Sequence, residues 1–189
     1  MSDPTARPLT KCKNFNALKE ARRGVMLHYD DSSSDAGAVA WFTDPECKVS
    51  YNYLVLDDGA YVPIVPDGKR AWHAGVCKTS DPARLPYADA NSAFVGIAVA
   101  TNDKTPATPA QIETVVWLTR REFERNGWPL TDGWRIVGHD SEAIWPSDAD
   151  TPVNLRGKRG RKIDPRGPDA TRPILSTATV RARVAGSTA

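Results

Sequence analysis

The chain has 189 residues, enough for one domain with a full core, and an ordinary globular composition with 40% hydrophobic and 25% charged residues. Twenty-five Lys and Arg against 23 Asp and Glu leave a net charge of +2, so nothing global calls for a nucleic-acid partner. No stretch approaches the roughly 20 apolar residues of a membrane-spanning helix, so a membrane span is also excluded.

The N-terminal stretch MSDPTARPLTKCKNF lacks the apolar segment of a secretory signal. The three cysteines, Cys12, Cys47 and Cys77, are odd in number and widely spaced, which argues against a disulfide framework. We therefore expect synthesis in a reducing cytoplasm, without a signal peptide. Nothing in the sequence suggests more than a monomer.

The first half of the chain predicts strands mixed with helices. Residues 14–23 (NFNALKEARR) are predicted as a short helix closed by Gly24, and GVMLHYD after them as a buried strand whose end carries His28. The serines of SSSDAGAVAWFTDP predict a capped helix that stops before Pro45. VSYNYLVLDDGAYVPIVP then predicts a β-hairpin, whose prolines make the second strand short or an edge strand.

The second half continues the alternation. FVGIAVAT (94–101) is predicted as a buried strand, and TPAQ (108–111) opens a helix with an N-cap, a proline and a capping-box glutamine. RIVGHD predicts a last strand that ends in His139, followed by a polar connection over 141–163. The order predicts a single α/β domain with a central mixed β-sheet flanked by helices. Its predicted limits are an N-terminal arm over 1–20, a folded domain over 21–170 and a weakly ordered tail over 171–189.

Three side chains suggest a metal site at the strand ends, in a surface groove. His28 and His139 each follow a predicted strand, and Asp164 is fixed among prolines and glycines in RKIDPRGP. Catalytic zinc takes three ligands of the His and carboxylate types and keeps a fourth position open. Each residue also has a plain structural explanation, a buried histidine or a surface salt bridge, and the spacing matches no short zinc motif. A site of three histidines that includes His73 is chemically reasonable as well.

From about residue 24 to 168 the chain resembles the zinc-dependent N-acetylmuramoyl-L-alanine amidases, the family of the phage amidase-type endolysins and the peptidoglycan recognition proteins. The resemblance is carried, in the family's order, by VMLHYD, VSYNYLVLDDG, RAWHAG, VGIAVAT, TPAQIETVVWL, IVGHD and RKIDPRGP. These stretches cover most of the chain.

The resemblance implies one Zn²⁺ ion on His28, His139 and Asp164. It implies two catalytic residues, Lys162 as the partner of the tetrahedral oxyanion and Tyr51 as the group that orients water or the carbonyl. Without the resemblance, Tyr51 would be interpreted as an ordinary strand residue packed in the core.

Four further residues are predicted to contact substrate: Asn52, Trp72, His73 and Arg161. Two features depart from the family pattern. Ala98 stands where many members have a glutamate that acts as general base, so the identity of the base stays open. Arg166 looks like an insertion in a sequence that is commonly Asp-Pro-Gly-Pro. The basic run at 156–162 is either a solvated loop or a surface that attracts the anionic cell-wall polymer.

The reaction implied is hydrolysis of the amide between N-acetylmuramic acid and L-alanine of the stem peptide in bacterial peptidoglycan, by zinc-activated water. A phage endolysin, which accumulates in the host cytoplasm and then reaches the wall, is the favoured setting. The alternatives are a cytosolic enzyme that recycles anhydro-muropeptides, a delivered antibacterial toxin, a zinc hydrolase of another amide, and a non-catalytic peptidoglycan-binding module. The complete ligand set argues against the binding module.

Overall fold

The computed structural model describes residues 3–44, 46–144, 146–159, 162–169, 171 and 173–186. Its main sheet has five strands in the order β4-β3-β6-β2-β7. The four strands β3, β6, β2 and β7 run parallel, and β4 pairs with β3 as an antiparallel edge strand. The elements are β1 (Phe15–Ala17), β2 (Gly24–Tyr29), α1 (Asp35–Thr43), β3 (Tyr53–Val55), β4 (Tyr61–Pro63), β5 (Lys69–Ala71), α2 (Ala90–Ala93), β6 (Phe94–Val99), α3 (Pro109–Arg125), η1 (Gly133–Arg135), β7 (Ile136–Gly138), α4 (His139–Glu142) and α5 (Thr177–Val184).

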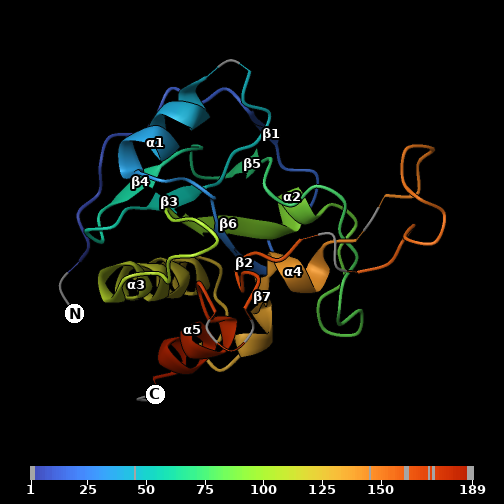
Figure 1. The fold of residues 1–189 in the computed structure, drawn as a ribbon. Helices are drawn as coiled ribbons and strands as arrows, with labels where there is room; N and C mark the ends of the chain where they lie inside the picture. Colours follow the sequence, from blue (N-terminus) through green and yellow to red (C-terminus); the bar gives the residue numbers. More distant parts are fainter. Residues whose placement is uncertain are drawn as a thin grey trace.

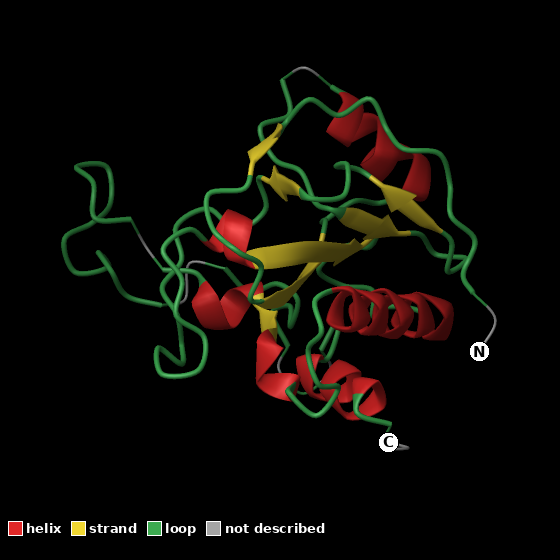
Figure 2. Ribbon diagram, turned by 180° about the vertical axis from the view of Figure 1, so that it is seen from behind, coloured by secondary structure: helices red, strands yellow, loops and turns green. Residues whose placement is uncertain are grey.

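Helices cover both faces of this sheet (Figure 1): α3 and α5 lie on one face and α1 on the other. The view from behind shows the same layers (Figure 2). The predicted α/β domain with a central mixed sheet is therefore confirmed. The hairpin is also confirmed, with its proline-containing strand at the edge.

Alternation along β2 decides which side chains face which layer. Val25, Leu27 and Tyr29 belong to the apolar cluster beneath α3 and α5. Met26 belongs to a different cluster, so His28, two residues further on, also faces away from α3. The strand thus supplies core residues from one face and a single histidine from the end of the other.

The predicted helix starts are confirmed at two places. Ser34 caps α1 by accepting from Gly37 N, and Thr108 caps α3 in a capping box with Gln111. These caps satisfy backbone N–H groups that a helix N-terminus otherwise leaves unpaired.

The predicted helix at 14–23 is wrong. Residues Phe15–Ala17 form β1, which pairs antiparallel with β5, and the chain then runs without a helix to β2. Arg22 is the physical reason for this path, because its guanidinium donates to the carbonyls of Ser92 at 2.9 Å and Lys69 at 2.6 Å. A side chain that links two distant backbones holds the segment against the sheet, which the local sequence pattern does not reveal.

The N-terminal residues lie along the outer side of β4. Arg7 N donates to Tyr61 O at 2.8 Å, Thr10 N donates to Pro63 O at 3.1 Å, and Tyr61 N donates to Thr5 O at 3.0 Å. The arm therefore covers the backbone groups of an edge strand that would otherwise be open to pairing with another chain. None of the helices in the described part of the chain is long and apolar enough to span a membrane.

The C-terminal segment is not weakly ordered where the structure describes it. Ser176 caps α5, and Leu175, Val180 and Val184 are buried in the same cluster as α3. The prediction missed these residues because their apolar spacing is short and lies between polar residues. The boundaries of the domain itself stay a prediction.

Replacing Leu175 with Ala is expected to lower the free energy of unfolding by about 2–5 kcal/mol, as for other fully buried leucines. Leu175 is 1% exposed, so the shorter side chain leaves a cavity in the core. Urea unfolding followed by fluorescence of the six tryptophans measures the change. Val153→Ala is the matched control, because Val153 is 77% exposed and should change stability by less than about 0.5 kcal/mol. Equal stability of the two variants would contradict a packed C-terminal segment.

An ion pair that joins β5 to α2 predicts a pH dependence of stability. Arg70 contacts Asp89 through two hydrogen bonds of 2.6 and 2.8 Å, and this lowers the pKa of Asp89 from 3.8 to about 2. A depressed carboxyl pKa stabilises the fold above the unfolded value, and that stability is lost as the pH falls toward about 2. Asp89→Asn should therefore be less stable than wild type at pH 6, with a difference that shrinks between about pH 4 and 2. Urea unfolding across this range tests it, and a difference that stays constant with pH would contradict it.

Candidate active site

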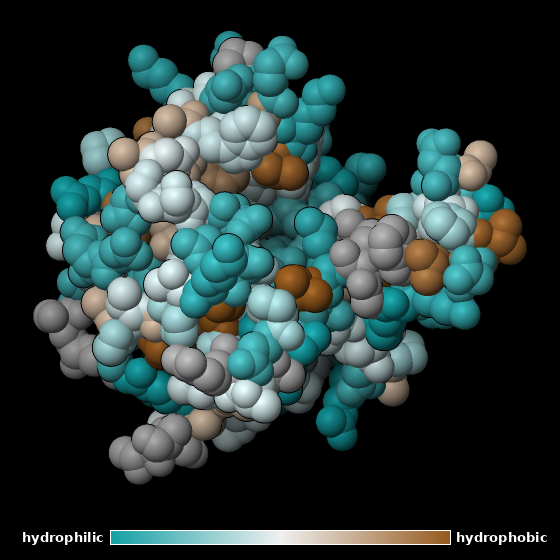
Figure 3. Space-filling model, viewed as in Figure 1, coloured by the Kyte–Doolittle hydropathy of each residue, from teal (hydrophilic) through white to brown (hydrophobic). Residues whose placement is uncertain are grey.

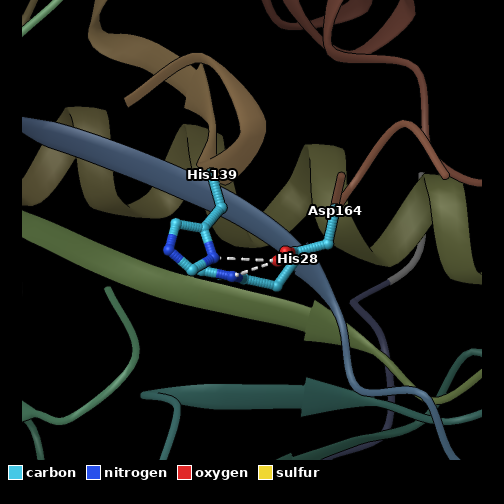
Figure 4. Close-up of side chains that lie close together, drawn as sticks. All are labelled: His28, His139 and Asp164. Atoms are coloured by element: carbon cyan, nitrogen blue, oxygen red, sulfur yellow. Dashed lines mark hydrogen bonds and ion pairs between the residues drawn. The ribbon is translucent and has the colours of Figure 1, made fainter. Parts of the chain in front are cut away.

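Three buried side chains meet at one end of the sheet (Figure 4). Asp164 Oδ2 lies 2.8 Å from His28 Nδ1 and 3.1 Å from His139 Nδ1. The three side chains offer one ligand atom each, and these atoms all lie within 4.8 Å of one another. The structure thus brings together the three residues that the sequence singled out as metal ligands.

The register of β2 and β7 explains why the two histidines are neighbours. These adjacent parallel strands pair Leu27 with Gly138, so the next residue of each strand, His28 and His139, emerges at the same edge. His139 is then the first residue of α4. Side chains crowd the residue just before it, since a Cβ on Gly138 would lie 2.3 Å from Asp140 Oδ1 and 2.9 Å from Pro165 Cδ.

Asp164 reaches this edge from a segment far along the chain. Asp140 N donates to Asp164 O at 2.6 Å, which fastens the backbone of Asp164 to α4. Burial by itself raises the pKa of Asp164, but contacts with His139 and His28 outweigh burial and hold the pKa well below its usual range. Asp164 is therefore a carboxylate at neutral pH.

The chemistry of these donors fits a metal ion. Burial lowers the pKa of His28 to about 4, so its imidazole is neutral at pH 7. A carboxylate oxygen and imidazole nitrogens then converge on one buried point, and N and O ligands of this kind are those that Zn²⁺ and related ions accept. A cation at this point would balance the buried carboxylate.

His73 lies beside this group and does not point its ring at Asp164. Its Nδ1 is 3.1 Å from His28 Nε2, on the side of the His28 ring away from Asp164. The group that could hold a metal is therefore His28, His139 and Asp164, and the alternative site of three histidines does not match the geometry.

Two of the three residues, His139 and Asp164, line a cleft of about 420 Å³, and His28 is fully buried behind it. Tyr51, His73 and Lys162 line it together with His139 and Asp164. The Tyr51 ring lies 4.9 Å from the His28 ring, and burial raises the pKa of Tyr51 well above 10, so its hydroxyl keeps its proton. Lys162 is exposed, and its ammonium is free to reach a ligand in the cleft.

The sequence interpretation missed other residues of the cleft wall: Tyr29, Asp30, Asp31, Val49, Asp103 and Ile163. One signal was available, because Asp30 and Asp31 follow His28 directly at the end of its strand. Asp30 accepts from Thr101 N at 3.0 Å, and its burial raises its pKa. The acidic character of part of the cleft wall could therefore have been anticipated.

Two of the residues predicted to contact substrate lie elsewhere. Asn52 is 3% exposed and accepts from Gly96 N at 2.9 Å, so it links strands in the interior. The Trp72 indole donates to Asn16 at 2.6 Å and is not part of the cleft wall. The structure shows structural contacts for both, and their contact with substrate stays a prediction. Arg161 lies outside the described residues.

The loop of residues 146–159 projects from the body of the molecule (Figure 1) and stands out as a separate lobe on the surface (Figure 3). Two of its cations are already paired with backbone. Arg159 donates to the carbonyls of Lys78 and Thr79 at 3.1 Å, and Arg156 donates to Thr151 O at 2.9 Å. Arg159 thus fastens the loop to the 78–79 segment and Arg156 holds it internally, which weakens the idea that the basic run exists to bind an anionic polymer.

Ala98 occupies the position beside His28 on the neighbouring strand. It is fully buried in an apolar cluster with residues of β3 and of the segment near α1. The site therefore has no carboxylate at this position, in agreement with the departure seen in the sequence.

Comparison with known proteins places this geometry in a family. The profile described as N-acetylmuramoyl-L-alanine amidase matches residues 19–167, which include all three residues of the candidate metal site. The chain belongs to this amidase family. The family match ends at residue 167, before α5.

Individual members of the amidase family align over parts of the chain. The 1,6-anhydro-N-acetylmuramyl-L-alanine amidase AmpD of Enterobacter cloacae is 39% identical over 96 residues, which is 50% of this chain and 46% of that protein. The N-acetylmuramoyl-L-alanine amidase A of Achromobacter lyticus is 22% identical over 138 residues, 70% of this chain and 69% of that protein. A crystal structure of a selenomethionine AmpD derivative shares the fold, with a TM-score of 0.66 and 23% identity over 96% of this chain and 94% of that one.

Proposed function

We propose that the protein is a zinc-dependent amidase that cleaves the bond between N-acetylmuramic acid and L-alanine of the peptidoglycan stem peptide. One observation carries the proposal: in a chain of the amidase family, His28 groups with His139 and Asp164, and the latter two line a cleft together with Tyr51 and Lys162. The names of the relatives describe hydrolysis of the same type of bond.

The three ligand residues would hold the ion, which when bound supplies Lewis acidity and a water of lowered pKa. Lys162 provides a positive charge for the oxygen that becomes negative when the amide carbonyl is attacked. Tyr51 keeps its proton and donates a hydrogen bond to the carbonyl or to the attacking water. His73 contacts His28 through its Nδ1 and also lines the cleft, where it would contact the substrate.

The setting that we propose is the bacterial cell wall, reached after synthesis in the cytoplasm, as for an endolysin. Ala98 supports this setting, because it leaves the site without the glutamate that the recycling amidases of this family place there. The second candidate is recycling of soluble anhydro-muropeptides. The 39% identity to the Enterobacter cloacae amidase over half of the chain favours this alternative.

One pair of digests tests activity and setting together. The protein is incubated with purified peptidoglycan sacculi and, separately, with a soluble anhydro-muropeptide, and the products are identified by mass spectrometry. Stem peptides that begin with L-alanine, absent after chelation and with Asp164→Asn, would support the amidase. Release from sacculi would support a wall enzyme, and release from the soluble substrate alone would support recycling. Intact muropeptides in every digest would overturn the proposal.

A further inference from the structure

In both candidate ligand histidines, the ring nitrogen that faces away from Asp164 contacts one of two consecutive residues, His73 and Ala74. His28 Nε2 lies 3.1 Å from His73 Nδ1, and His139 Nε2 lies 2.8 Å from Ala74 O. In each ring the other nitrogen, Nδ1, faces Asp164. The 73–74 segment therefore supplies the hydrogen-bond partners of both Nε2 atoms.

With an ion bound in place of the hydrogen bonds to Asp164, these contacts determine where the protons of the neutral rings lie. Ala74 O can only accept, so His139 carries its proton on Nε2 and a lone pair on Nδ1. Phe94 O, 3.3 Å from His73 Nε2, can also only accept, so His73 carries its proton on Nε2 and accepts through Nδ1. His28 must then donate from Nε2, which leaves the lone pair of its Nδ1 directed at Asp164. Both rings present the nitrogen that a metal requires.

The side-chain oxygen of Asn91 holds the 73–74 segment, which contacts the rings of both His28 and His139. Asn91 Oδ1 accepts from His73 N at 2.8 Å and from Ala74 N at 2.7 Å. Asn91 is 8% exposed and lies in α2, next to the ion pair of Asp89 with Arg70. Since two consecutive N–H groups converge on one atom, the 73–74 backbone has little freedom to turn.

The His73 ring is also held by packing. A Cβ on Gly96 would lie 2.7 Å from His73 Cγ and 2.8 Å from Cδ2, so the ring rests directly on the backbone of β6. Gly96 thus fixes the position of the His73 ring, and Asn91 fixes the position of the His73 backbone.

We propose that Asn91 and His73 are positioning residues of the metal site. Asn91 holds the 73–74 segment, His73 fixes the ring of His28, and Ala74 O fixes the ring of His139, so that both Nδ1 atoms face the ion. The inference rests on the proposed zinc chemistry. Outer partners of this kind typically contribute about 10- to 100-fold to metal affinity.

Zinc affinity is the direct test, measured at pH 7 by competition with a chromophoric chelator. The variants are Asn91→Ala, which loses the shared acceptor, and His73→Phe, which keeps the ring volume on Gly96 but cannot accept from His28. Asn91→Asp is the matched control, because a carboxylate oxygen can accept both N–H groups. His28→Ala reports whether the measured zinc occupies the proposed site. Thermal unfolding of the metal-free variants checks that each is folded.

We expect His73→Phe and Asn91→Ala to bind zinc about 10- to 100-fold more weakly than wild type, and Asn91→Asp to bind like wild type. The double variant Asn91→Ala/His73→Phe should lose less zinc affinity than the two single losses combined, because Asn91 acts on His28 through His73. Wild-type affinity in folded Asn91→Ala and His73→Phe would overturn the inference while leaving the zinc site intact. If Asn91→Ala does not fold, His73→Phe decides in the same way. Equal zinc binding by wild type and His28→Ala would instead overturn the proposed function.

Discussion

Replacing Asp164 with Asn is expected to abolish amidase activity and to weaken zinc binding by more than about 100-fold. Loss of a residue that only hydrogen-bonds to a metal ligand typically weakens binding by about 10- to 100-fold, and loss of a ligand should cost more. The variant keeps the shape of the side chain and removes the negative charge that sits 2.8 Å from His28 and 3.1 Å from His139. Loss of a metal's electrostatic contribution, about 4 kcal/mol, corresponds to roughly 10³-fold in rate. Zinc content after dialysis and release of stem peptides from sacculi measure the two effects.

The control for this prediction is Asp150→Asn, which removes the same charge from the projecting loop. Asp150 is exposed and is not part of the cleft wall, so this variant should keep both zinc and activity. An Asp164→Asn protein that retains zinc and full activity would show that Asp164 is not a ligand. The aspartate would then be only the partner of two buried histidines.

Replacing Lys162 with Met is expected to lower kcat by about 10²–10³ while zinc content stays at the wild-type level. Lys162 lines the cleft beside Asp164, so its ammonium is placed to meet negative charge that develops on the substrate. Methionine keeps much of the side-chain length and removes the charge. Single-turnover kinetics on a soluble muropeptide, with zinc measured in the same samples, separates the two effects.

Two variants make the role of Lys162 specific. Lys162→Arg restores a positive charge and should recover part of the rate. Lys158→Met removes an exposed cation four residues earlier and should leave kcat unchanged. If Lys158→Met lowered kcat as much as Lys162→Met, the effect would come from the overall charge of the loop and not from a contact with the reacting group.

The sequence by itself was enough to predict most elements of the sheet and their caps. Local signals determine these features: the apolar run of β2, the capping box at Thr108 and the prolines of the edge strand. The same signals placed His28 and His139 at strand ends, because polar residues directly follow apolar runs there. The identity of the metal ligands came from resemblance to a family, since the spacing alone left alternatives open.

Only the tertiary structure decided which distant residues meet. Asp164 lies 136 residues from His28, and nothing in its own neighbourhood fixes the contact, which depends on the path of a long connection and on the bond to Asp140. Asn91 carries no sequence signal at all, since its role exists only where α2 passes the 73–74 segment.

The same reason accounts for the two wrong element predictions. Residues 14–23 follow the sheet because Arg22 binds carbonyls of α2 and β5, and the C-terminal helix is ordered because its apolar residues pack against α3. Backbone propensity and periodicity are properties of neighbours in sequence, and hydrogen-bond partners and core contacts are properties of neighbours in space. The sequence thus determined the elements and the two histidines, and the packing of those elements determined the cleft, the third ligand and the residues that hold the site in place.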